Sequence, residues 1–174
     1  MIPQFGTPEF SRIIDTRSIG NDPVRLEANE AERGALAKRF GIVAIDRLTA
    51  EVTLEPTKAA ILVAGSFAAA MVQSCAISGE DLPVAVSEPL SLRFVSERAL
   101  GRPDEELELD ADDLDEIEFS GTQFDLGEAV AQSLALAIDP FLESPGADEF
   151  RRTSGLFGEP AANPFAALAK LKKD

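Results

Sequence analysis

A chain of 174 residues, 45% of them hydrophobic, can bury one core, so we expect one domain with ordered appendages. Its net charge of −15 disfavours RNA, DNA and anionic membranes as ligands, because affinity for phosphates comes mainly from Lys and Arg. The chain has no His and one Cys, which excludes zinc sites, Cys–His dyads and Ser–His–Asp triads within one chain. These absences predict a non-enzymatic protein without a cofactor or metal, which acts by binding another macromolecule.

Several features bear on where the protein acts. No stretch reaches the roughly 18–20 consecutive apolar residues that span a membrane. Residues 1–5 lack the basic start and apolar core of a signal peptide. A single cysteine cannot form an internal disulfide, which fits a reducing compartment. We therefore expect a cytoplasmic protein that contacts neither membrane nor DNA.

The first helix is predicted over residues 29–40. Asn29 is a good N-cap, Glu32 stands at the capping-box position, and Gly41 follows the last turn. A short strand is expected before this helix, at residues 11–14.

Alternation of apolar and polar residues predicts the strands that follow the helix. Their expected ranges are 47–55, 60–74 and 83–95. Pro89 implies that the third strand lies at an edge or is broken there, because proline cannot donate to a ladder. We expect an α+β fold: a curved antiparallel sheet or partly closed β-barrel of about five or six strands, with two or three packed helices.

An acidic run occupies residues 104–118, with ten acids and no base. Such charge density resists compact packing, so we expect a partly ordered loop with short strands near 106–109 and 115–119. The run offers a surface for a basic partner, although charge runs are often only solvated loops. Its candidate binding residues are Asp104, Glu105, Glu106, Asp112, Asp113 and Asp115.

The second helix is the clearest predicted element. Asp125 is expected to cap it and Glu128 to complete a capping box, with one apolar stripe running to Ile138. Pro140 ends the helix, because the residue before proline avoids helical geometry. The single domain, with its acidic loop, is therefore expected to span 1–142.

Residues 143–163 are rich in Gly, Pro and Ser and predict a flexible linker. Residues 164–174 then predict a short helix, which at this length needs a surface to dock on. It is expected to dock either on a partner or on its own domain. Its candidate binding residues are Asn163, Pro164, Phe165, Leu168 and Leu171.

Two stretches together resemble a known family. Residues 125–140, DLGEAVAQSLALAIDP, resemble the D-L-x-E-x-V-x-x-x-L-x-L-x-x-x-P helix of the YceD family, the large ribosomal RNA subunit accumulation proteins. Residues 163–172, NPFAALAKLK, resemble the C-terminal N-P-F-x-x-L-x-x-L-K signature of that family. Cys75 stands where the family has the first cysteine of a C-x-x-C pair, but Ser78 replaces the second. A metal or redox role for Cys75 is therefore not expected, and it should pack as a small hydrophobe.

The resemblance implies a role in large-subunit ribosome biogenesis, in the accumulation of 23S ribosomal RNA. We expect this role to operate through protein contacts, with a ribosomal or ribosome-assembly protein as partner. Direct RNA binding through Arg151, Arg152, Lys170, Lys172 and Lys173 is the weaker alternative, because no aromatic platform accompanies these cations. A magnesium-dependent hydrolase is a third alternative, and it would require acids that converge in one concave site.

Overall fold

The computed structural model describes residues 9–58, 60–96 and 115–154 of the chain. These residues form two sheets, three α-helices and one short 3-10 helix. The strands are β1 (Ile13–Asp15), β2 (Val24–Glu27), β3 (Ala44–Pro56), β4 (Ala60–Ser74), β5 (Asp81–Ser96), β6 (Asp115–Phe119) and β7 (Gln123–Asp125). The helices are η1 (Thr16–Ser18), α1 (Glu30–Phe40), α2 (Leu126–Ala137) and α3 (Ala147–Thr153). The expected α+β class is confirmed.

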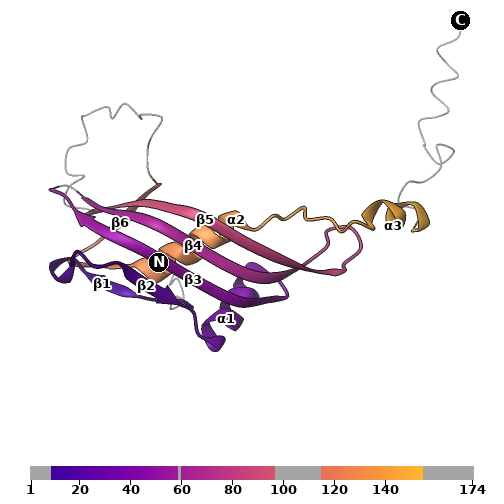
Figure 1. The fold of residues 1–174 in the computed structure, drawn as a ribbon, viewed down its shortest axis with the longest axis horizontal. Helices are drawn as coiled ribbons and strands as arrows, with labels where there is room; N and C mark the ends of the chain where they lie inside the picture. The colour runs from indigo at the N-terminus through magenta and orange to yellow at the C-terminus, as the bar shows by residue number, and fades with distance from the viewer. Residues whose placement is uncertain (1–8, 59, 97–114, 155–174) are drawn as a thin grey trace, which may run out of the picture. The chain divides into compact units, whose positions relative to one another are not determined.

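The main sheet is curved and has five strands in the order β2-β3-β4-β5-β6 (Figure 1). It does not close into a barrel. The β2–β3 and β3–β4 pairs are antiparallel, as expected, but β6 pairs with β5 in the parallel sense, from Leu92↔Asp115 to Ser96↔Phe119. The expectation of a purely antiparallel sheet is therefore wrong at its last pair. A parallel pair requires a crossover, and residues 97–114 are long enough to provide one.

The chain divides into two units, Met1–Gln73 with Pro83–Asp139 and Ser74–Leu82 with Pro140–Asp174. The second unit contains α3, which the sequence did not predict. α3 occupies part of the segment 143–163 that was expected to be a linker, so that segment is not wholly without secondary structure. The expected boundary after residue 142 stays a prediction.

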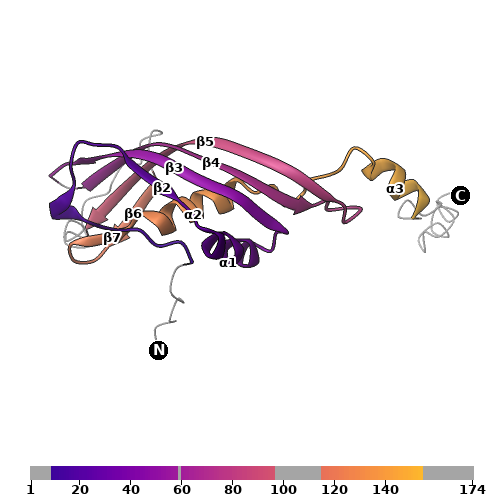
Figure 2. The ribbon, with the colours of Figure 1, turned by 60° about the horizontal axis from the view of Figure 1, so that its bottom comes forward.

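The core of the first unit lies on one face of the sheet. Figure 2 shows α1 and α2 on the same side of the strands. Side chains that alternate along β3, such as Leu48 and Val52, meet Leu126 and Leu134 of α2 in one buried cluster. The rings of Phe94 in β5 and Phe124 in β7 are in contact, with centroids 4.2 Å apart. Apolar residues recur at every second position of the strands and about every 3.6 positions of the helix, so each element has one apolar face, and these faces pack against each other.

The predicted caps of α1 are confirmed. The Asn29 side chain accepts a hydrogen bond from the Glu32 N–H, and the Glu32 carboxylate accepts one from the Asn29 N–H. Gly41 ends the helix in the left-handed conformation, with φ of 68°. This backbone conformation is easy for glycine and strained for other residues, so the sequence alone locates the end of α1.

The first turn of α2 is fixed by contacts with residues 10–12. The Asp125 carboxylate accepts hydrogen bonds from the Glu128 N–H, the Ser11 hydroxyl and the Arg12 N–H, at 3.1, 2.6 and 2.8 Å. Gly127 lies so close to this segment that a Cβ atom there would stand 2.6 Å from the Phe10 carbonyl oxygen. The chain before β1 is therefore packed directly against the helix start.

The capping box expected at Glu128 is not formed. The Glu128 carboxylate instead makes two hydrogen bonds with the Arg39 guanidinium, at 2.7 and 2.9 Å, and accepts one from Gln132. Bidentate, charge-assisted bonds of this kind are among the strong hydrogen bonds of proteins. Arg39 also pairs with Glu9, so α1, α2 and the N-terminal segment meet at this cation.

Leu134 and Leu136 provide a matched test of the core. Leu134 is fully buried and Leu136 is 83% exposed, although they stand two residues apart in α2. Leu134→Ala should lower the free energy of unfolding by about 3 kcal/mol, because it leaves a cavity. Leu136→Ala should change it by less than about 0.5 kcal/mol. Urea denaturation of both variants measures this difference, and equal losses would contradict the packing described here.

Two helical glycines provide a second test. Gly127→Ala should destabilise the protein by about 1–3 kcal/mol, because the added methyl group collides with the backbone of residues 10–12. Gly34→Ala should stabilise it by up to about 1 kcal/mol, because open space surrounds Gly34 and alanine favours a helix. Thermal and urea melts give both values. Stabilisation by both substitutions would show that α2 does not dock on residues 10–12.

Candidate binding surfaces

The predicted binding residues fall almost entirely outside the described part of the chain. This applies to ten of them: Asp104, Glu105, Glu106, Asp112, Asp113, Asn163, Pro164, Phe165, Leu168 and Leu171. The expected docking helix and most of the acidic loop therefore stay predictions. Asp115 is described, and it is the exposed first residue of β6.

β6 continues the acidic run as a strand, in agreement with the strand expected at 115–119. Glu116 and Glu118 are exposed, whereas Ile117 and Phe119 are partly buried and pack against the core. The Arg93 guanidinium of β5 forms an ion pair with Glu116 at 2.9 Å. The strand therefore presents one apolar face to the core and one acidic face away from it.

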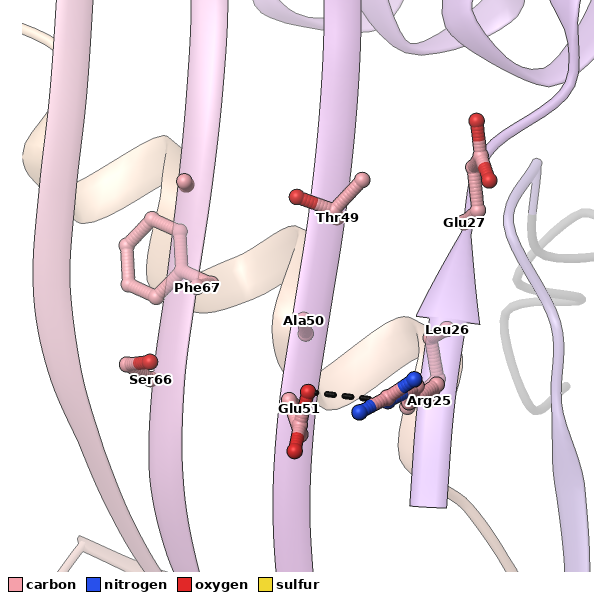
Figure 3. A pocket seen from close by; sticks show the side chains of 9 residues that line it. Arg25, Leu26, Glu27, Thr49, Ala50, Glu51, Ser66 and Phe67 are labelled. Carbon is pink, nitrogen blue, oxygen red and sulfur yellow. Dashed lines mark hydrogen bonds and ion pairs between the residues drawn. The ribbon is translucent and has the colours of Figure 1, made fainter. Parts of the chain in front are cut away.

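A hollow of about 350 Å³ lies over β2, β3 and β4 (Figure 3). Arg25, Thr49, Glu51 and Ser66 are among the residues that line it. The Arg25 Nε donates to a Glu51 carboxylate oxygen at 2.9 Å, across β2 and β3. Both side chains are more than half exposed, so this pair contributes little to stability. Nothing in the sequence pattern predicted this hollow, because it depends on which strands are neighbours.

Two further hollows lie elsewhere in the first unit. One of about 530 Å³ is lined by residues of α1 and of the start of β3, and the half-exposed Val43 is among them. The other, of about 340 Å³, lies near the β3–β4 turn and includes Lys58 and Phe119. In the part of the chain that the structure describes, no three acidic or cysteine side chains converge to hold a metal ion.

Most arginines of the described residues bind a carboxylate. Arg151 forms ion pairs with Glu143 and Asp148, and Arg152 donates to the Asp148 carbonyl oxygen. The other arginines with a carboxylate partner are Arg12, Arg17, Arg25, Arg39 and Arg93. The predicted cationic pair at 151–152 is therefore engaged within its own segment.

The second unit contains Cys75, whose sulfur atom accepts several backbone hydrogen bonds. Its Sγ accepts from the N–H groups of Ile77 and Ser78, each at 3.4 Å, and of Ser144 at 3.2 Å. Hydrogen bonds from the hydroxyl and N–H of Ser78 are the main reason that the pKa of Cys75 is lowered to about 6. Cys75 is buried, as expected of a small hydrophobe, but it is also an acceptor, which the sequence did not predict. The Ser78 and Ser144 hydroxyls lie 3.5 Å apart beside it.

The described helices include none long and apolar enough to cross a membrane. The chain matches no family model, no curated protein and no solved structure. The YceD resemblance therefore rests on the residues alone. Within residues 125–140, four of the matching residues have folding roles: Asp125 caps α2, Glu128 binds Arg39, and Val130 and Leu134 are fully buried.

The Cys75 loop predicts a dependence on pH. Because the pKa of Cys75 is about 6 in the folded chain and roughly 8.5 in an unfolded one, the bonds to the thiolate stabilise the folded loop fully above pH 8.5. That contribution decreases as the pH falls and is lost once it passes below 6. Hydrogen exchange at the Ser144 amide, corrected for its intrinsic rate, should show protection that rises from pH 5 to 9. In Cys75→Ser this rise should be absent, and a rise of the same size there would refute the role of the thiolate.

Proposed function

We propose that the chain is a non-enzymatic ribosome biogenesis factor that supports the accumulation of 23S ribosomal RNA and the large subunit. It acts through protein contacts, with a basic ribosomal protein as the partner that fits best. The observation that carries this proposal is the pair of stretches 125–140 and 163–172, which resemble two YceD motifs in the same order along the chain.

The charge of the chain supports a basic partner. The net charge of −15 produces a field that attracts cationic proteins from a distance and speeds their association. Ribosomal proteins that bind RNA must carry cationic surfaces, because they neutralise phosphates. An acidic protein can cover such a surface before the RNA is available. This contact should weaken with salt, since exposed charges are screened.

The alternative is an accessory factor that contacts precursor ribosomal RNA directly. The ion pairs of Arg12, Arg39 and Arg151 count against it, because a guanidinium already bound to carboxylates must exchange partners to reach a phosphate. The acidic strand β6 adds repulsion of the phosphate backbone. Protein contacts therefore remain the better proposal.

The proposal can be tested in the cells that make this protein. Its removal should lower the ratio of 23S to 16S ribosomal RNA, and the wild-type gene should restore the ratio. Affinity purification at low salt should recover a basic ribosomal protein in RNase-treated extracts, with less recovered at moderate salt. An unchanged ratio, or recovery of precursor RNA without a ribosomal protein, would exclude this mechanism.

A further inference from the structure

The main sheet has strand edges to which another chain could add. Backbone N–H and C=O groups that face away from the sheet can bind an extended segment as a further strand. Among the described residues such edges occur at the outer side of β2, at the two ends of β3 that β2 does not cover, at the part of β5 that β6 does not cover, and at the outer side of β6. They differ in what occupies or interrupts them.

The outer edge of β2 is occupied at Glu27. The Ala28 N–H donates to the Leu48 carbonyl oxygen. The backbone N–H and C=O groups of Leu26 and Ala28 therefore point toward β3, and those of Glu27 point away from the sheet. The outward Glu27 carbonyl oxygen accepts a hydrogen bond from the Arg12 guanidinium at 2.9 Å. Arg12 is held there by two further bonds to Glu32. A partner strand would have to displace this arginine.

The free edge of β5 is interrupted by prolines. β6 pairs only with Leu92–Ser96, which leaves the earlier part of β5 unpaired on that side. Pro83 and Pro89 stand six residues apart, so both nitrogen atoms point to the same side of the strand. We infer that this side is the one away from β4, because proline within a ladder occurs where no donor is needed. Only the N–H groups of Ala85 and Ser87 remain between them.

β6 is different, because it contains no proline, and no strand of the described chain pairs with its outer side. Its alternation is regular, with Ile117 and Phe119 toward the core and Glu116 and Glu118 away from it. A strand added beside it would continue both faces of the sheet. The added strand must then carry apolar residues on the inner face and, opposite the acids, residues of positive charge.

We propose that the outer edge of β6 binds an extended basic segment of another protein as a sixth strand of the sheet. This inference rests on the proposed function, because it places the basic partner on this surface. The segment alternates apolar residues, beside Ile117 and Phe119, with Lys or Arg, beside Glu116 and Glu118. Backbone hydrogen bonds provide the affinity, and the alternation provides the specificity.

Charge also excludes a second copy of this chain as the occupant. Two β6 strands side by side would place Glu116 and Glu118 of one copy next to those of the other, and like charges opposite each other destabilise a sheet. Arg93 neutralises only one of these two acids. The same acids favour a cationic strand.

The test uses the full chain and two synthetic peptides of ten residues. The first alternates lysine and valine, and the second has the same composition with its lysines and valines in two blocks. In about 0.1 M salt the alternating peptide should shift the amide resonances of residues 115–119 and slow their hydrogen exchange. The block peptide has the same charge, but it cannot place valines on the inner face of the sheet and lysines on the outer face along its whole length. It should therefore not protect these amides.

Two charge reversals give the matched variants. Glu118→Lys should weaken binding of the alternating peptide about fivefold, because an attraction becomes a repulsion next to the added strand. Glu55→Lys makes the same change at an exposed position of β3, three strand spacings or about 14 Å from β6. In about 0.1 M salt this distance exceeds the screening length, so binding should be unchanged.

Three outcomes would overturn the inference: resonance shifts confined to residues outside β6, equal protection by the block peptide, or equal weakening by both reversals. The proposed function fails separately. If a basic ribosomal protein is recovered but the peptide does not protect β6, the partner binds elsewhere and this inference alone falls. If the peptide adds to β6 as described while the 23S ribosomal RNA ratio is unaffected, the edge is a binding site and the ribosomal role is wrong.

Discussion

The carboxylate of Asp125 joins the parts of the first unit on which the rest of its structure depends. Asp125 is the last residue of β7, and its carboxylate caps α2 and binds the segment before β1. One side chain therefore holds the helix and the N-terminal chain together. The helix that it caps supplies Leu126, Val130 and Leu134 to the core. Gly127 permits the close approach that the three hydrogen bonds require.

The charges of the protein are divided between two uses. Those near the helix ends form ion pairs within the first unit: Arg12 binds Glu32, and Arg39 binds Glu9 and Glu128. Glu116 and Glu118 of β6 point away from the core, and Glu116 is paired with Arg93. A charged edge keeps a sheet from aggregating with its own copies and still allows a partner of opposite charge. Stability and recognition thus use different carboxylates.

The motif residues of α2 show how a sequence signature can reflect folding. Asp125 and Glu128 are polar, and each is bonded within the first unit. Leu136 is the opposite case, because it belongs to the matched stretch and is exposed. Within this chain Asp125 and Glu128 are engaged in folding, and the exposed positions of the helix remain available for a partner.

The sequence by itself determined the elements whose signals are local. The cap of α1, its end at Gly41, the ranges of β4 and β6 and the N-cap of α2 follow from hydrogen bonds or alternation among near neighbours. It did not reveal α3, the parallel pairing of β6, the hydrogen bonds to Cys75 or the hollow over β2–β4. Those depend on which distant segments become neighbours, as when Glu128 of α2 binds Arg39 of α1. Only the tertiary structure decides such contacts, because the free energy of a pair depends on a partner that the local sequence does not contain.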